Sequence, residues 1–264
     1  MQDFKVEKLP LSVFIITKNE EQRLEAALDS IKDLANEIII VDSGSSDQTI
    51  AIAEKYTKII KYKKWEGFGQ QKSYAESLCT YDWILNIDAD EIVTNELAAE
   101  IRLIFQQNQH KERDGFWLKI VEIPHFVDNP KFYGRKKYYL RLYNKNICAY
   151  RKSEVHDSVI TESKNLGYLE QYLLHKSFRS YQHQIEKLNF YSDFQALDSF
   201  KKGKKLNRLK VVFILFFAFT KHYFIRKYFL YGIEGYLESW LYAFSRLTKY
   251  AKIIELERKA KNSS

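Results

Sequence analysis

In the first hundred residues, short β-branched apolar runs alternate with segments that have the apolar spacing of single helices. The first run, residues 11–17, is almost wholly apolar, which predicts a strand buried on both faces. The expected strands cover residues 11–17, 37–41, 58–62 and 82–87. Helices are expected over residues 20–31, from the turn at 43–47 to residue 56, and from the glycines at 67 and 69 to residue 79. Single helices between strands imply right-handed crossovers, and so a mostly parallel, doubly wound α/β sheet.

Polar strings follow three of these expected strands at the point where each strand ends. They are residues 17–20, 42–47 and 88–91. In a doubly wound sheet, ligands bind beyond the carboxyl ends of the strands, so we expect the three strings to form one site. Each string alone also fits an ordinary solvated turn. The sequence lacks a Gly-x-Gly-x-x-Gly after its first strand, which argues against a dinucleotide-dependent oxidoreductase. It also lacks a phosphate-binding Gly-Lys-Ser/Thr loop.

Two carboxylates of the third string, Asp88 and Asp90, are separated by one residue. In an extended strand, residues two apart point to the same side, so both carboxylates are expected to face one ligand. Oxygen donors so close repel each other unless a cation lies near them, and Mg²⁺ or Mn²⁺ is the cation that such oxygens prefer. A diphosphate is the natural remaining ligand. Two solvated turn carboxylates are the alternative.

Charge is divided unevenly along the chain. Residues 1–130 hold 15 Lys and Arg against 23 Asp and Glu, a net charge of −8, and residues 131–264 hold 27 against 11, a net charge of +16. A basic second half predicts an anionic partner, either an anionic lipid leaflet or nucleic acid, unless it is a merely solvated face.

The last third of the chain changes in character. Residues 181–200 have the pattern of an amphipathic helix, and a basic run then precedes residues 211–219, which are wholly apolar. That apolar stretch is about half the length of a transmembrane helix. We therefore expect a helix in the bilayer interface with its basic flank on anionic lipid, and an ordinary core helix is the alternative. The basic run contains Lys201, Lys202, Lys204, Lys205, Arg208 and Lys210.

Three strings, in order, resemble the nucleotide-sugar-binding half of family 2 glycosyltransferases, which have a GT-A fold. They are IITKNE at 15–20, IVDSGSSDQT at 40–49 and LNIDADE at 85–91. More narrowly, WEGFGQQK at 65–72, the DADE string and VHD at 155–157 resemble the lipopolysaccharide core β-glucosyltransferases. The resemblance implies a catalytic GT-A type domain over residues 1–180, and the basic and apolar pattern described above predicts a helical, membrane-facing extension over residues 181–264.

The resemblance also implies roles for individual residues. Thr17 and Asp42 match positions that hold the uracil and ribose of a UDP-sugar, and Asp88 matches the carboxylate near the ribose and sugar. Asp90 matches the metal ligand that bridges to the diphosphate. Lys72 lies where relatives place a cation beside the nucleotide, although a solvated helix lysine is the alternative. The expected nucleotide-sugar-binding residues are Thr17, Asn19, Glu20, Asp42, Lys72 and Asp88, and the expected metal ligands are Asp90 and His156.

The catalytic base is expected within residues 154–157. An inverting transfer is a single displacement at the anomeric carbon, in which a base takes the proton of the acceptor hydroxyl. Relatives usually read Val-His-Glu here, and this chain has Asp157 in the acidic place. Asp157 is the first choice for the base and Glu154 the reserve. His156 completes the metal site or contacts phosphate, unless it is a structural histidine.

These expectations describe a metal-dependent, inverting hexosyltransferase that uses Mg²⁺ or Mn²⁺. It would move a hexose, glucose as first choice, from a UDP-sugar to a lipid-linked oligosaccharide such as the lipopolysaccharide inner core. The polar opening residues lack the features of a secretory signal, so we expect a cytoplasmic protein at the inner face of the cell membrane, with no nucleic-acid partner. The alternatives are a same-fold transferase with a capsule, teichoic-type or protein acceptor, and a nucleic-acid-binding module.

Overall fold

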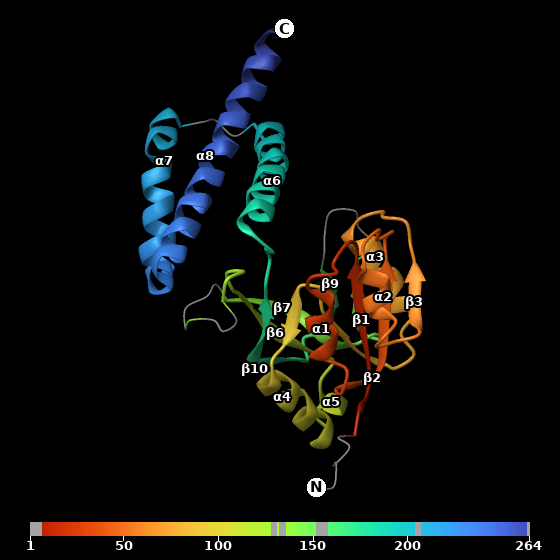
Figure 1. Ribbon diagram of the computed structural model, residues 1–264. Helices are drawn as coiled ribbons and strands as arrows, with labels where there is room; N and C mark the ends of the chain where they lie inside the picture. The colour runs from red at the N-terminus through yellow and green to blue at the C-terminus, as the bar shows by residue number, and fades with distance from the viewer. Residues whose placement is uncertain (1–6, 128–130, 132–135, 152–157, 204–206, 263–264) are drawn as a thin grey trace. The chain divides into compact units, whose positions relative to one another are not determined.

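The chain divides into two compact units, which are described separately (Figure 1). The structure is a computed structural model that describes residues 7–127, 131, 136–151, 158–203 and 207–262. Unit 1 comprises residues 1–122 and 136–176, and unit 2 comprises residues 123–135 and 177–264. Unit 2 therefore takes a short segment from the middle of the chain in addition to the C-terminal third.

Unit 1 contains strands and helices in alternation, followed by a more strand-rich second part. Its first elements are β1 Leu9–Thr17, α1 Leu24–Asp29, β2 Ala35–Asp42, α2 Thr49–Ala53, β3 Ile59–Tyr62, α3 Phe68–Ser77 and β4 Trp83–Asn86. Its later elements are β5 Glu91–Val93, α4 Asn95–Gln106, α5 Gln109–Glu112, β6 Gly115–Glu122, β7 Lys136–Asn144, β8 Ala149–Tyr150, β9 Val159–Ile160 and β10 Leu166–His175. The four strands expected in the first hundred residues all form, so this prediction is confirmed.

Among the described residues, the main sheet has eight strands in the order β3-β2-β1-β4-β7-β6-β10-β5. The first four are parallel to one another, as are β6 and β10. Strand β7 runs antiparallel to both of its neighbours, and β5 runs antiparallel to β10. The sheet is thus mostly parallel, which confirms the expected α/β fold of GT-A type.

The parallel strands are apolar because both faces of the sheet are covered by helices (Figure 1). Val13 and Ile15 of β1 pack with residues of α1, α2 and α4 on one face. Phe14 and Ile16 alternate with them and pack with α3 on the other face. Each such side chain contributes about 1.5–3 kcal/mol when it is removed from water, so these contacts fix the positions of the strand ends.

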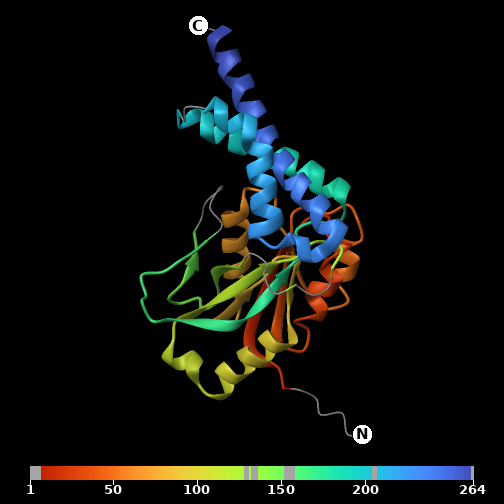
Figure 2. The ribbon, with the colours of Figure 1, turned by 90° about the vertical axis from the view of Figure 1, so that its left-hand side faces the viewer.

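Unit 2 is helical, and the expected helices over residues 181–200 and 211–219 are confirmed. It contains α6 Tyr181–Lys201, α7 Arg208–Thr220, a π-helical turn Lys221–Ile225, a 3-10 turn Tyr228–Tyr231 and α8 Gly232–Asn262. Helix α8 packs against both α6 and α7 (Figures 1 and 2). Among the described residues, no helix is both long enough and apolar enough to cross a bilayer.

The turn between α7 and α8 depends on a close backbone approach. Lys227 and Gly232 both adopt positive φ, 58° and 64°, as the chain reverses direction. A Cβ on Gly235 would lie 1.9 Å from the carbonyl oxygen of Tyr228. Only glycine fits at residue 235, because any side chain would push the turn away from α8.

Candidate active site

The three polar strings meet at one edge of the sheet, as the sequence predicted. Thr17 at the end of β1 is in register with Asp42 at the end of β2. On the other side of β1, Phe14 is in register with Asn86, the last residue of β4. Parallel strands end at the same edge, so the residues that follow β4 lie beside those that follow β1 and β2.

The carboxylate of Asp42 is buried and is oriented by its own loop. One oxygen, Oδ2, accepts hydrogen bonds from the backbone N–H groups of Gly44 at 2.7 Å and Ser45 at 2.8 Å. The other, Oδ1, accepts from the hydroxyl of Ser45 at 2.5 Å. Gly44 has φ of 93°, which suits glycine in this tight turn. The loop therefore holds Asp42 in one orientation at the sheet edge.

The hydroxyl of Thr17 is buried and has no hydrogen-bond partner among the residues that the structure describes. A buried hydroxyl without a partner typically costs about 1–3 kcal/mol, and an exception of this kind in a protein often marks a ligand site. Asn19 ties the first two strings together: its backbone N–H donates to Ser45 Oγ at 2.8 Å, and its Oδ1 accepts from the N–H of Ser46 at 2.9 Å. The Thr17 hydroxyl is therefore available to a polar group that binds at this edge.

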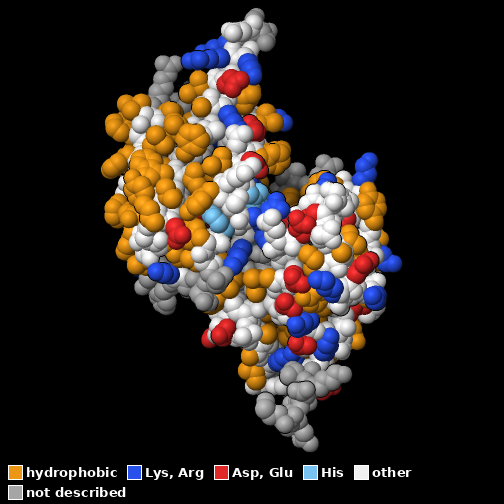
Figure 3. Space-filling view, viewed as in Figure 1, with side chains coloured by type: hydrophobic (Ala, Val, Ile, Leu, Met, Phe, Trp, Pro, Cys, Tyr) orange, Lys and Arg blue, Asp and Glu red, His pale blue; other side chains and the backbone are white. Residues whose placement is uncertain are grey.

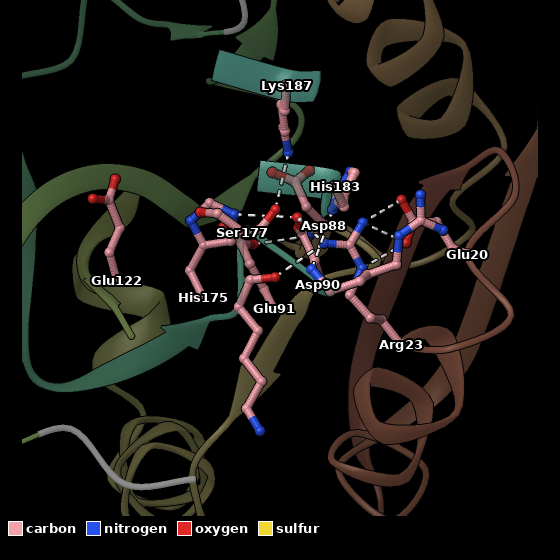
Figure 4. Close-up of polar contacts among 12 residues, drawn as sticks. Glu20, Arg23, Asp88, Asp90, Glu91, Glu122, His175, Ser177, His183 and Lys187 are labelled. Atoms are coloured by element: carbon pink, nitrogen blue, oxygen red, sulfur yellow. Dashed lines mark hydrogen bonds and ion pairs between the residues drawn. The ribbon is translucent and has the colours of Figure 1, made fainter. Parts of the chain in front are cut away.

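Glu20 positions an arginine that the sequence did not identify (Figure 4). Its carboxylate accepts two hydrogen bonds from Arg23, at 2.7 and 2.6 Å. The same guanidinium donates to Asp90 Oδ2 at 3.2 Å and to the carbonyl oxygen of Lys176 at 3.0 Å. The sequence signal was the spacing of three residues between Glu20 and Arg23 on one helical turn. Arg23 thus connects the first string to the third.

Asp88 is held between two cations. Its Oδ1 lies 2.7 Å from Lys72 Nζ, and its Oδ2 accepts from Arg141 Nη2 at 3.0 Å. Lys72 is fully buried in α3, so the alternative of a solvated helix lysine is wrong. Burial acts to raise the pKa of Asp88, but Lys72 and Arg141 outweigh it, so its pKa lies well below the ordinary value.

Asp88 and Asp90 do not lie in an extended strand, so the geometric argument made for them from the sequence is wrong. Strand β4 ends at Asn86, and the chain turns, with the N–H of Glu91 donating to the carbonyl oxygen of Asp88 at 2.9 Å. The turn gives each carboxylate different partners. Asp88 pairs with Lys72 and Arg141, whereas Asp90 pairs with Arg23. The pair is therefore neutralised by cations rather than solvated.

Glu91 belongs to the same network and was missed as a functional residue. It is buried, its Oε1 accepts from Arg141 Nη2 at 3.2 Å, and its Oε2 accepts from the N–H of Asp88 at 2.8 Å. Arg141 also donates to the buried Asn86 side chain. Burial raises the pKa of Glu91 above its ordinary value even though Arg141 opposes this. Glu91 thus fixes both the turn and the guanidinium that holds Asp88.

His175 lies at the end of β10, with its Nε2 3.3 Å from Asp90 Oδ2 (Figure 4). Burial acts to lower the pKa of His175, but the contact with Asp90 outweighs it and the net shift is upward. Burial acts to raise the pKa of Asp90, and the contacts with His175 and Arg23 bring it below its ordinary value. No pattern in the sequence linked His175 to Asp90, because the two strands that bring them together are distant in the chain.

A cavity of about 230 Å³ opens beside Asp88. It combines the ionic network with aromatic side chains, which is the mixture expected of a pocket for a polar organic ligand. Its lining residues are Asp88, Glu91, Trp117, Ile120, Glu122, Lys137, Tyr139, Leu140, Arg141, Tyr150, Ser158, Val159 and His175.

The expected base and second metal ligand, Glu154, Asp157 and His156, lie outside the described residues. They stay predictions. Tyr150 and Ser158, which precede and follow this segment, both line the cavity.

The carboxyl edge of the sheet offers a partial set of ligands for a divalent cation. Within the part of the chain that the structure describes, no group of three or more His, Cys, Asp or Glu side chains is placed to hold a metal ion. Asp90 Oδ2 and His175 Nε2 nevertheless lie 3.3 Å apart, so the imidazole could become a second ligand if it gave up the proton that its contact with Asp90 favours. Mg²⁺ is usually held by one or two carboxylates together with substrate phosphates and water, so this partial donor set fits a cation that binds with a diphosphate.

Residues 12–158 match the family model described as glycosyl transferase family 2. The chain is also 39% identical over 261 residues to an uncharacterized glycosyltransferase of Rickettsia conorii, with 96% of this chain and 92% of the relative covered. The chain is a family 2 glycosyltransferase.

A second relative of this glycosyltransferase is the lipopolysaccharide core biosynthesis glycosyltransferase LpsC of Rhizobium meliloti. It is 30% identical over 262 residues, with 95% of this chain and 94% of LpsC covered. Among solved structures, S. aureus TarS 1–349 has 14% sequence identity and a TM-score of 0.48, with 92% of each chain covered. At that score, the likeness to TarS carries no weight for function.

Proposed function

We propose that this glycosyltransferase moves a hexose, with glucose as the first choice, from a UDP-sugar to a lipid-linked oligosaccharide. The acceptor class proposed is the inner core of lipopolysaccharide, and the new linkage forms with inversion. The LpsC relative supports this acceptor, since its printed name places it in lipopolysaccharide core biosynthesis and it matches nearly all of both chains.

The observation that carries the donor assignment is the convergence of Thr17, Asp42 and Asp88 at one strand edge. The Thr17 hydroxyl, which has no hydrogen-bond partner in the described part of the chain, suits a polar edge of the uracil, and the fixed Asp42 carboxylate suits the hydroxyls of the ribose. Asn19 and Glu20 would act by holding these groups in place, since Asn19 joins the loops and Glu20 orients Arg23. Lys72 would act through Asp88, to which it is bound.

A divalent cation, Mg²⁺ or Mn²⁺, would be held by Asp90, with His156 as the second ligand that the sequence suggested, or with His175 once its ring has given up its proton. When bound, it would neutralise the charge that develops on the departing diphosphate. The cationic partners of Asp88 and Asp90 keep these acids ionised, because they hold both pKa values below the ordinary range. Both acids are therefore ionised at neutral pH.

Asp157 is proposed as the base, with Glu154 in reserve. The oxygen of the acceptor hydroxyl would form the new bond to the anomeric carbon while the bond from that carbon to the diphosphate oxygen breaks. The hydroxyl proton would pass to the carboxylate, and UDP would leave. Holding both sugars in line contributes much of the rate, and the cavity beside Asp88 offers a place for the acceptor.

Unit 2 is proposed to hold the enzyme at the inner face of the cell membrane. The side chains of Val212, Phe216 and Phe217 on α7 are 72%, 66% and 59% exposed, and hydrophobic side chains cover this side of the unit (Figure 3). The exposed Lys201 and Lys202 precede α7. An apolar helix with a basic flank favours reversible adhesion to anionic lipid.

The donor assignment is tested with a panel of nucleotide sugars with and without Mn²⁺ or Mg²⁺, scored by thermal shift and by hydrolysis. UDP-glucose should give the largest metal-dependent response. A larger response to another nucleotide sugar would replace glucose, and no response to any UDP-sugar would refute the donor class. Transfer to lipopolysaccharide core, capsule, teichoic-type and protein acceptors then separates the acceptor classes.

The membrane assignment is tested by cosedimentation with anionic vesicles. Lys201, Lys202, Lys204 and Lys205, all changed to Glu, should abolish vesicle binding while hydrolysis of the UDP-sugar continues. The matched control changes four exposed lysines of unit 1, Lys55, Lys58, Lys61 and Lys64, to Glu. Vesicle binding that survives the first variant, or that the control loses equally, would contradict the assignment.

A further inference from the structure

Three aromatic side chains of unit 1, Trp117, Tyr138 and Tyr168, form an open aromatic platform on neighbouring strands. We propose that this aromatic platform binds the sugar units of the acceptor that lie beyond the one accepting the new bond. The inference rests on the proposed function, because it takes the acceptor to be an oligosaccharide. It assigns the glycosyltransferase an extended acceptor site rather than a pocket for a single sugar.

The aromatic platform is built by the sheet. Trp117 of β6 is in register with Tyr168 of β10, and their rings stack with centroids 6.4 Å apart and planes inclined at 20°. Tyr138 of β7 meets Tyr168 edge-on, with centroids 5.6 Å apart. Strands β7, β6 and β10 are neighbours, so the three rings lie side by side on rigid elements. Such a surface is already arranged before a ligand binds, which reduces the entropy lost on binding.

Two of the three rings are open to solvent, and Trp117 is partly buried against the core. Tyr168 is 67% exposed and Tyr138 is 44% exposed. Burial of an aromatic side chain is strongly favourable, and rigid exposed rings that gather on one surface commonly mark a binding site. The platform therefore has apolar area available for a partner.

Trp117 joins the platform to the cavity beside Asp88. Its side chain lines that cavity together with Tyr139 and Glu122, and it also stacks on Tyr168 of the platform. The cavity, at about 230 Å³, is smaller than the range of about 300–1,000 Å³ that is usual for drug-sized ligands. It has room for a small ligand such as one sugar ring, so the rest of a longer acceptor has to lie outside it.

The chemistry of this surface fits a saccharide. A sugar ring has an apolar C–H face and a rim of hydroxyls, so it matches aromatic faces bordered by polar groups. Tyr138 and Tyr168 carry hydroxyls at the tips of their rings. The cavity side adds Glu122 and Lys137, whose charged groups are 3.5 Å apart and suit hydrogen bonds to hydroxyls (Figure 4 shows Glu122). A lipid surface would need a larger continuous apolar area than three rings supply.

The test uses the full chain and two soluble probes: core oligosaccharide released from lipopolysaccharide by mild acid, and a single free sugar of that core. Tyr168→Ala removes a ring that is mostly exposed, so it should fold normally. It should raise the Kd and acceptor KM for the oligosaccharide about fivefold to tenfold, the range expected for one aromatic stacking contact. The Kd of UDP and the acceptor KM of the single sugar should not change.

Two variants control the experiment. Tyr168→Phe keeps the ring and should restore most of the oligosaccharide affinity, which separates stacking from a hydroxyl contact. Leu103→Ala removes an exposed apolar side chain of α4, 51% exposed, that is not part of the platform. It should behave as the parent does.

The outcomes distinguish this proposal from the proposed function. Weaker oligosaccharide binding in Tyr168→Ala supports the platform even if no nucleotide sugar supports transfer. The absence of transfer would refute the proposed function but not the platform. Efficient transfer with an unchanged oligosaccharide KM in both Tyr168→Ala and Tyr138→Ala overturns the platform. The platform proposal would also be overturned if the parent protein bound no oligosaccharide. It would be overturned as well if vesicles displaced the oligosaccharide from the parent protein and bound more weakly to Tyr168→Ala.

Discussion

Replacing Lys72 with Met tests whether the buried ion pair between Lys72 and Asp88 stabilises the folded protein. The Met side chain has a similar length and no charge, so the substitution removes the ammonium while it keeps most of the packing. Lys72 is fully buried, and its Nζ lies 2.7 Å from Asp88 Oδ1. Loss of one partner of a buried ion pair typically costs about 3–5 kcal/mol, because the other charge is left without compensation.

We expect a loss at the low end of this range, about 3 kcal/mol. Arg141 still contacts Asp88 in the variant, and the Asp88 side chain is 28% exposed. For a domain of this size, about 3 kcal/mol corresponds to a fall in Tm of roughly 6–12 °C. Thermal unfolding followed by circular dichroism measures it. Lys32→Met, at a surface pair with Asp29, is the control and should leave Tm unchanged.

A double-mutant cycle with Asp88→Asn tests the mechanism itself. Each single change removes one member of the Lys72–Asp88 pair and keeps the other charge, whereas the double variant removes both charges of the pair. Lys72→Met/Asp88→Asn should therefore be more stable than the sum of the single effects predicts, with a coupling of about 2 kcal/mol. If Lys72→Met melts as the parent does, or if the coupling is zero, the pair does not stabilise unit 1 and the reasoning is wrong.

Three other changes test separate parts of the structure. Asp90→Ala should abolish metal-dependent UDP binding in calorimetry while the circular dichroism spectrum is kept, because the site loses its principal oxygen ligand; binding that is indifferent to EDTA in the parent would exclude the cation. Asp157→Asn should keep UDP binding and lower transfer about a hundredfold, since an amide cannot accept the proton; if Glu154→Gln has that effect instead, Glu154 is the base. Burial raises the pKa of Glu238 in α8 to about 7 from an ordinary value of 4.5. The folded state then binds more protons than the unfolded state between these values, so the stability present below pH 4.5 is lost as pH rises through 7. Glu238→Gln is neutral at every pH, and urea unfolding should show it more stable than the parent at pH 8, by up to about 3 kcal/mol, with no such gain at pH 5.

Local patterns were sufficient to predict the strands of the first hundred residues and the helices α6 and α7. A strand covered on both faces has to be apolar along its length, so residues 11–17 could be recognised without their partners. The carboxyl ends of parallel strands share one edge, so the chain order of the polar strings was enough to bring Thr17, Asp42 and Asp88 together.

The later strands and the ionic network could not be read from the sequence. Arg141 and Asp88 are 53 residues apart, and Arg23 and Asp90 are 67 apart, so nothing in the local spacing links either pair. The contact of Arg141 with Asp88 depends on where β7 enters the sheet, and strand pairing at such distances is decided by the whole core. The strand argument for Asp88 and Asp90 failed for the same reason, since the end of β4 depends on its pairing with β1 and β7.

By itself, the sequence determined the α/β class, the order of its parallel strands along the chain and the residue types at the carboxyl edge of the sheet, because these follow from periodicity and from short strings. Only the tertiary structure decided which cation neutralises each carboxylate, that Lys72 is buried rather than solvated, and that Trp117, Tyr138 and Tyr168 form one surface. The physical reason is that burial and ion pairing are properties of surfaces that meet in space, and in this chain those surfaces come from strands far apart in the sequence.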